Sequence, residues 1–172
     1  MSLRPDLVEC WVFRVREPAG LEILLIRRAP GRIFPGLWQC VTGGIDPGER
    51  VPMAALRELR EETGFGSDRI EAFFDLDQVA PFYDEGVDAI VVSAIFAARV
   101  RPDVEPVLSS EHDAYRWTSP DEALRLAIWP SYAESMHRIR AALLDPDVAP
   151  WFEMTPAGRR IRRRPAGGAP PA

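Results

Sequence analysis

The sequence contains no lysine, and all 21 of its basic residues are arginine. A catalytic lysine and a Walker-type phosphate loop, which requires one, are therefore excluded. The only two cysteines, Cys10 and Cys40, fall inside apolar runs. They match no zinc pattern and cannot build a disulfide framework, so we expect reduced core thiols, as in a cytoplasmic protein. No apolar run is long enough to span a membrane and no signal peptide opens the chain, so we expect no membrane association.

The charge of the chain is unevenly distributed. The net charge is −5, although five arginines stand close together near the C-terminus, so the rest of the chain is five units more negative than the whole. An acidic body argues against broad nucleic-acid binding, and a short arginine run is typical of a solvated segment. If the substrate is a polyphosphate, a divalent cation would offset the repulsion. The five arginines are Arg159, Arg160, Arg162, Arg163 and Arg164.

Length and hydrophobic periodicity predict one α/β domain over residues 1–145, followed by an irregular tail rich in arginine and proline over 146–172. Strands are expected both as a hairpin and separated by helices, which favours a mixed sheet between helices. The clearest helix is 52–63, because Gly64 suits its C-terminal cap, whereas Arg50 gives it a poor N-cap. Further helices are expected at 119–128 and 130–144, and strands at 8–15, 22–28, 37–42, 70–79, 88–100 and 114–118.

Three carboxylates share one side of the predicted helix 52–63. Glu58, Glu61 and Glu62 are three or four residues apart, so their side chains are neighbours beside the apolar face. A solvated acidic face is the usual meaning of such a run. A divalent cation is the alternative, because Mg²⁺ prefers oxygen ligands. The preceding loop favours the cation: Gly43 lets the backbone approach closely, and Glu49 is placed to pair with an arginine of the helix.

The segment from Gly43 to Phe65 resembles the Nudix box, G-x5-E-x7-R-E-U-x-E-E-x-G-U, where U is apolar. The resemblance implies a Nudix-type α/β/α sandwich with a mixed sheet, and hydrolysis of a diphosphate bond in a nucleoside diphosphate linked to another group. It implies Mg²⁺ or Mn²⁺ held by Glu58, Glu61, Glu62 and the carbonyl of Gly43, with Glu61 and Glu62 in catalysis. Glu49 and Arg57 are then structural anchors. The fixed positions are filled by Gly43, Glu49, Arg57, Glu58, Leu59, Glu61, Glu62, Gly64 and Phe65.

Two segments outside the box resemble dihydroneopterin triphosphate diphosphatases within the same family. One is the SEHDAYRW run, in which the resemblance makes Glu111 a base or metal ligand; a surface carboxylate is the alternative. His112 beside it either contacts phosphate or packs in the fold. The other is the WQCVTG run, in which Trp38 either lines a ring-binding pocket or is a core residue. The same Trp-Gln pair also resembles diadenosine tetraphosphate hydrolases.

Two further residues are candidates for substrate binding. Arg27, which ends a strand together with Arg28, either reaches phosphate or belongs to a simply exposed pair. Tyr83 either stacks on a base or pterin or packs on the sheet, and its spacing from the box resembles dinucleoside polyphosphate hydrolases. Pro81 has the spacing that resembles ADP-sugar hydrolases, so these two positions decide nothing together.

The sequence therefore predicts a metal-dependent diphosphatase acting on a nucleotide or pterin polyphosphate, most directly a nucleoside triphosphate or dihydroneopterin triphosphate. A diadenosine polyphosphate hydrolase and a non-catalytic nucleotide-sensing Nudix module are the alternatives. A sensing module usually loses box carboxylates, and this chain keeps them all. A homodimer is left open.

Overall fold

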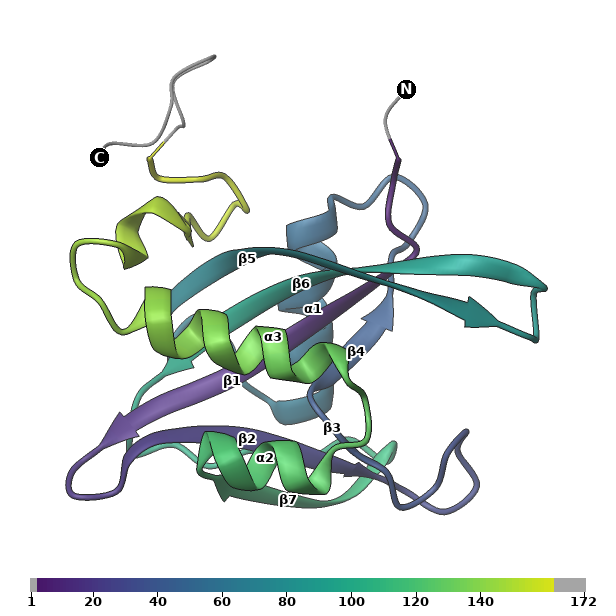
Figure 1. The fold of residues 1–172 in the computed structure, drawn as a ribbon, viewed down its shortest axis with the longest axis horizontal. Helices are drawn as coiled ribbons and strands as arrows, with labels where there is room; N and C mark the ends of the chain where they lie inside the picture. The colour runs from purple at the N-terminus through teal and green to yellow at the C-terminus, as the bar shows by residue number, and fades with distance from the viewer. Residues whose placement is uncertain (1–2, 163–172) are drawn as a thin grey trace.

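The computed structural model describes residues 3–162 and shows a sheet with helices on both faces (Figure 1), so the predicted α/β/α sandwich is confirmed. Its helices are α1 (Val51–Thr63), α2 (Pro120–Leu126), α3 (Ser131–Arg138), the π-helical turn η1 (Ile139–Leu143) and the 3-10 turn η2 (Ala149–Trp151). Its strands are β1 (Leu7–Arg16), β2 (Gly20–Arg28), β3 (Trp38–Gln39), β4 (Val41–Gly44), β5 (Ile70–Asp84), β6 (Ala89–Val100), β7 (His112–Thr118) and β8 (Glu153–Met154).

Strand β1 is central, and its two edges differ. Along one edge β6 runs parallel to it, the one parallel pairing among the described strands. The other edge is shared, because β4 pairs with Leu7–Cys10 and β2 pairs with Val12–Arg16. Strand β2 continues past this point between β3 and β7. The sheet therefore splits where β2 leaves β1, and β4 occupies the split beside α1.

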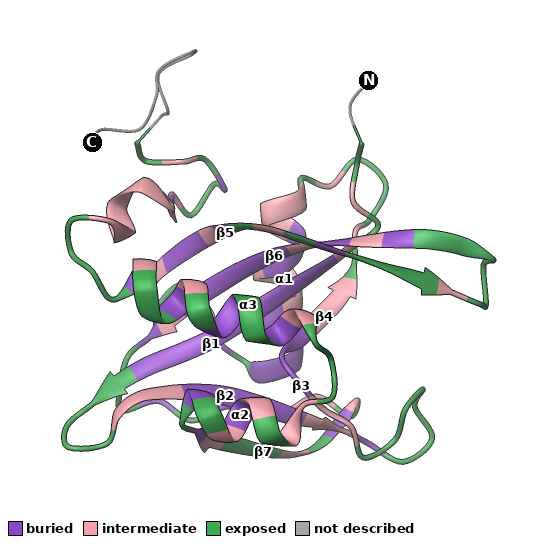
Figure 2. Cartoon of the chain, viewed as in Figure 1, coloured by how far each residue is buried: buried purple, intermediate pink, exposed green. Residues whose placement is uncertain are grey.

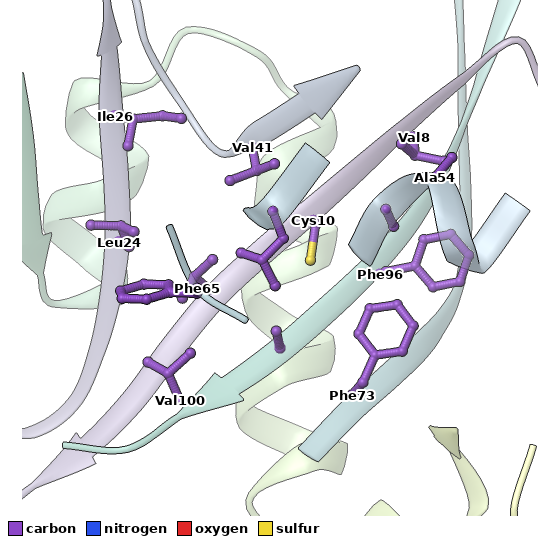
Figure 3. Packing of buried hydrophobic residues seen from close by; sticks show 14 of the residues in the cluster. Val8, Cys10, Leu24, Ile26, Val41, Ala54, Phe65, Phe73, Phe96 and Val100 are labelled. Carbon is purple, nitrogen blue, oxygen red and sulfur yellow. The ribbon is translucent and has the colours of Figure 1, made fainter. Parts of the chain in front are cut away.

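The alternation of β1 divides the core into two layers. Cys10 and Val12 join the cluster beneath α1, part of which Figure 3 shows. Trp11 and Phe13 point the other way and pack with residues of α2 and α3. Because alternate side chains of β1 pack on opposite faces, nearly the whole strand is buried, as Figure 2 shows. Cys10 and Cys40 are buried and unpaired, as predicted.

Helix α1 matches its sequence signals closely. It begins at Val51, one residue before the prediction, and Arg50 makes no side-chain cap. Gly64 has φ 71° and its N–H donates to the carbonyl of Arg60 at 2.9 Å, so it ends the helix as predicted. The C-terminal helix predicted at 130–144 is regular only to Arg138 and continues as the π-helical turn η1.

The chain after Pro146 departs from the prediction of an irregular tail. The short strand β8 pairs with Phe73 and Phe74 at the edge of β5. Arg160 donates to Asp75 at 2.6 Å and to the carbonyl of Trp151 at 3.1 Å. This part of the tail therefore lies on the sheet instead of being solvated. A two-residue strand has no periodicity that a sequence could reveal. Arg163 and Arg164 fall outside the described residues.

Strand β5 also runs further than predicted, to Asp84 instead of residue 79, and forms a long hairpin with β6. Beyond Val92 this two-stranded ribbon projects past the end of β1 (Figure 1). Pro81 lies inside it and is exposed, which fits the rule that proline in a sheet stands on an edge. Over residues 3–162, the helices are too short or too polar to cross a bilayer.

Candidate active site

Helix α1 presents its carboxylates at the split in the sheet. Ala55 and Leu59 are fully buried against the strands and fix the rotation of the helix. The side next to this buried face then carries Glu58, Glu61 and Glu62, as their spacing in the sequence predicts. Glu62 is buried, Glu58 is half-buried and Glu61 is exposed, so the three project from the core towards solvent in a graded series.

The end of strand β4 lies directly against one of these carboxylates. A Cβ atom at Gly43 would overlap the carboxyl group of Glu58, whereas a Cβ at Gly44 would meet nothing within 4 Å. Gly43 is therefore required by close approach of the loop to the helix, and Gly44 is not. The backbone N–H of Thr42 also donates to Glu62 at 3.4 Å, so β4 touches two of the three carboxylates.

Arg57 joins the loop to the helix. Its Nε and one terminal nitrogen each donate at 3.1 Å to Glu49, which is the contact that the sequence predicts. The guanidinium also donates to the carbonyl of Gly44 at 2.9 Å, to Glu58 at 2.7 Å and to Glu61 at 3.2 Å. Hydrogen bonding to Arg57 lowers the pKa of Glu49, and the same contact raises the pKa of Arg57. The Arg57 guanidinium thus positions the carboxylates of Glu49, Glu58 and Glu61.

Charge repulsion and burial are concentrated at Glu62. Burial, followed by the charge of Glu58, raises the pKa of Glu62 to about 8. The Thr42 N–H and the charge of Arg28 act in the opposite direction but are smaller. Burial also raises the pKa of Glu58, against the effect of Arg57. The positive charge of the nearby arginines therefore does not fully offset the repulsion among the carboxylates of the site.

Glu111 reaches the same cluster from the other side. The turn before β7 is fixed to α1, because the N–H of Ser109 donates to the carbonyl of Glu62 at 3.3 Å. The carbonyl of Glu111 accepts from the N–H of Ala29 at 2.9 Å, which ties the turn to the end of β2. The charge of Glu111 raises the pKa of both Glu58 and Glu62. The residue picked out by its resemblance therefore stands within electrostatic range of the box carboxylates.

Arg28 and His112 are cross-strand partners beside this cluster. His112 is 5% exposed, and neither ring nitrogen has a hydrogen-bond partner within residues 3–162. Burial, followed by the charge of Arg28, lowers the pKa of His112 to about 4, so the ring is neutral at pH 7. The packed interpretation of His112 fits this environment. Arg28 itself was not singled out from Arg27 by the sequence, because only the strand register tells which of them faces the carboxylates.

The three residues predicted to bind substrate are not brought to the cluster. Trp38 packs with the core beneath α2 and α3, on the face opposite α1. Arg27 donates to Asp113 at 2.7 Å, and its guanidinium carbon lies 5.7 Å from the centre of the Trp38 ring. Tyr83 lies on the projecting ribbon, is 60% exposed and donates to Asp88 at 2.8 Å.

The donor set fits a hard divalent cation. Glu58, Glu61, Glu62 and Glu111 offer only oxygen, which Mg²⁺ and Mn²⁺ prefer. The crowding of carboxylates around Glu62 and the absence of a Cβ at Gly43 are what such a site needs. Among the described residues no three acidic or imidazole groups already form a metal cage, and Arg57 holds the carboxylates of Glu58 and Glu61. Metal binding would therefore exchange Arg57 contacts for metal contacts.

Comparison with known proteins decides the family. The model of the NUDIX domain matches residues 6–139. The chain belongs to the Nudix family. Nudix membership places it among the hydrolases that act on acid anhydrides, a family that generally uses divalent metals such as Mg²⁺.

Relatives of this Nudix protein carry different names. An octanoyltransferase from Myxococcus xanthus is 34% identical over 124 residues, which are 70% of this chain but 32% of that protein. The asymmetrical bis(5'-nucleosyl)-tetraphosphatase of Rattus norvegicus is 34% identical over 108 residues, covering 62% of this chain and 70% of that one. The nucleoside triphosphatase NudI of Salmonella arizonae is 30% identical over 122 residues, covering 68% and 84%.

Solved structures agree on the fold. A binary complex of the C. elegans Ap4A hydrolase superposes with a TM-score of 0.68 at 20% identity, covering 80% of this chain and 96% of that chain. The E. coli dihydroneopterin triphosphate pyrophosphohydrolase gives 0.64 at 21% identity, covering 83% and 97%. At these identities the likeness concerns the fold alone, and the substrate has to be argued from the site.

Proposed function

We propose that this Nudix protein is a metal-dependent diphosphatase that cleaves a nucleoside triphosphate or dihydroneopterin triphosphate. The observation that carries the proposal is the meeting of Glu58, Glu61 and Glu62 of α1 with Glu111 of the turn before β7. Four carboxylates around a glycine loop could hold a divalent cation, and that cation would neutralise the phosphate charge in the reaction. The relative named as a nucleoside triphosphatase supports this substrate class.

Each group has a role in the proposed reaction. Glu58, Glu61, Glu62 and the carbonyl of Gly43 would hold Mg²⁺ or Mn²⁺, which would neutralise phosphate charge and lower the pKa of a bound water. Glu111 accepts the proton of the attacking water or completes the ligand set.

Arg57 does not contact substrate in this scheme. It holds the glycine loop against α1 through Glu49 and thereby positions Glu58.

A diadenosine polyphosphate hydrolase is the second candidate. It is favoured by the 34% identical rat relative, which is named as a tetraphosphatase of that kind. The two candidates share the carboxylate site and differ in the group attached to the phosphates, so a substrate panel separates them.

The test is a phosphate-release assay with a coupled phosphatase or pyrophosphatase, in Mg²⁺ and in Mn²⁺. The panel contains nucleoside triphosphates, dihydroneopterin triphosphate, diadenosine polyphosphates and ADP-ribose. The wild type is compared with Glu62→Gln and with the matched control Glu71→Gln, whose carboxylate is exposed on β5 and pairs with Arg99 at 3.0 Å. We expect metal-dependent turnover by the wild type and the control, and its loss in Glu62→Gln.

Turnover of a triphosphate would support the first candidate, and turnover of diadenosine polyphosphates alone would support the second. Equal rates for wild type and Glu62→Gln would overturn the assignment of the carboxylates. No turnover of any substrate with either metal would overturn the proposed activity on these classes.

A further inference from the structure

Two aromatic side chains meet at the surface where the loop after β2 approaches the linker between α2 and α3. Phe34 belongs to the loop 29–36, and Trp129 belongs to the linker 127–130. Their ring centres are 6.0 Å apart with an angle of 75° between the planes, an edge-to-face contact. Phe34 is 60% exposed and Trp129 is 39% exposed, so much of both ring surfaces is open to solvent.

The backbone of Phe34 is in an unfavourable conformation. Its φ is 54°, in the left-handed region that bulky side chains rarely adopt. The loop holds it there: Arg28 Nε donates to the carbonyl of Ile33 at 2.5 Å, and the N–H of Leu37 donates to the carbonyl of Phe34 at 3.2 Å. Burial of the ring does not compensate for the strain, because the ring is exposed. Strain that displays a side chain, instead of burying it, points to a role at the surface.

The same loop leads to the carboxylate cluster. Arg32, two residues before Phe34, lies 3.5 Å from Glu111. Arg28, the last residue of β2, is the cross-strand partner of His112, the neighbour of Glu111. Arg32 therefore links this loop to the carboxylate cluster, and both arginines precede Phe34 in the chain. The order along the chain is cation, cation and aromatic ring.

We propose that Phe34 and Trp129 bind the planar ring of the substrate, while Arg28 and Arg32 contact its phosphates. A molecule with a flat heteroaromatic group at one end and a polyphosphate at the other matches this arrangement of aromatic and cationic groups. The inference rests on the proposed function and extends it to the group that the box does not specify.

Trp38 is less suited to this role than the Phe34–Trp129 pair. The guanidinium carbons of Arg27 and Arg116 lie 5.7 Å and 5.2 Å from the centre of the Trp38 ring. The ring also packs with the core beneath α2 and α3. Two guanidinium groups and core side chains therefore already surround the Trp38 ring, whereas the rings of Phe34 and Trp129 keep solvent-exposed surface.

The experiment separates ring binding from phosphate binding. Phe34→Ala and Trp129→Ala are compared with Ile33→Ala and Ile128→Ala, which remove exposed apolar side chains next to each ring. For each variant, KM and kcat are measured with the best substrate of the panel, and Ki is measured for inorganic tripolyphosphate, which has no ring. Loss of one stacking contact is expected to raise KM roughly ten-fold.

In the two aromatic variants we expect that rise in KM, with kcat within about two-fold of the wild type and Ki for tripolyphosphate unchanged. The two isoleucine variants should match the wild type, and Phe34→Tyr should restore KM. Unchanged KM in both aromatic variants would overturn the proposal while leaving the proposed function intact. A parallel rise in KM and Ki would also overturn it, because the loop would then only shape the phosphate site.

Failure of the proposed function would be seen separately, as a wild type that turns over nothing in the panel. Calorimetric titration with nucleoside and pterin monophosphates then tests the aromatic pair by itself. Binding by the wild type that is lost in Phe34→Ala and Trp129→Ala would support the ring site. No binding, or binding that neither substitution weakens, would overturn it.

Discussion

Replacing Gly43 by alanine should remove activity while leaving the fold in place. The three atoms nearest to the new Cβ all belong to the Glu58 side chain, and all lie closer than the 3.0 Å that real Cβ atoms keep. The obstructing group is the far end of a flexible side chain, not backbone. The clash is therefore relieved by displacing the Glu58 carboxylate and not by opening the sheet.

The energetic consequences for stability and activity differ in size. Forcing Glu58 into a poorer rotamer costs about 1 kcal/mol, and replacing glycine by alanine in a permitted conformation returns up to about 1 kcal/mol through the unfolded state. The free energy of unfolding should therefore change little. A catalytic group displaced by about 1 Å can lower the rate about 100-fold. The displaced carboxylate also loses its 2.7 Å contact with Arg57.

The assay compares kcat/KM and its Mg²⁺ dependence in Gly43→Ala and Gly44→Ala, together with urea unfolding of both. Gly44 is the matched control, because a Cβ there meets nothing within 4 Å. We expect kcat/KM to fall about 100-fold in Gly43→Ala, with a higher Mg²⁺ requirement, and to stay near wild type in Gly44→Ala.

A double-mutant cycle tests the cause. In a Glu58→Ala background the clash partner is gone, so Gly43→Ala should add little further loss. The reasoning is refuted if Gly43→Ala is as active as the wild type, or if it costs the same factor with and without the Glu58 side chain.

Three further predictions follow from the electrostatics. Gln at position 62 keeps the shape but not the charge, so Glu62→Gln should lower kcat/KM by at least about 100-fold, with an unfolding free energy no lower than that of the wild type. Arg57→Lys cannot hold Glu49 with two parallel N–H donors, so urea unfolding should show a loss of about 1–2 kcal/mol; an unchanged midpoint and slope would argue against the anchor role. Burial raises the pKa of Glu9 above 4.5, so the wild type loses stability as the pH rises from 4.5 towards the folded-state pKa. Glu9→Gln lacks this loss, and its advantage over the wild type should be absent near pH 4 and present at pH 8; a constant difference at both pH values would contradict it.

The sequence predicts well those features that depend on local period and spacing. The carboxylate side of α1, the end of the helix at Gly64 and the Arg57–Glu49 contact all follow from positions within one short segment. Their side chains meet because a helix repeats every 3.6 residues and the loop is tied to it directly. The two buried thiols and the alternation of β1 follow in the same way from local apolar patterns.

Features that depend on register or on strained backbone could not be predicted in this way. The pairing of β2 with β7 shifts between Arg27 and Arg28, and this irregularity helps to decide which arginine faces the carboxylates. Phe34 is a phenylalanine in a conformation usually left to glycine, which no propensity would suggest. Strand β5 runs through Pro81, where a proline usually interrupts a sheet, because an exposed edge accommodates it.

The projecting ribbon of β5 and β6 has a consequence for the solubility of the protein. Past Val92 it has left β1, and β8 pairs with β5 only at Phe73 and Phe74, so the ribbon exposes strand edges together with Tyr83 and Ile90. Such edges are templates for pairing between copies. The turn at its tip carries acidic groups only, and repulsion between them keeps the edges of separate molecules apart until salt screens it. These acidic residues are Asp84, Glu85 and Asp88.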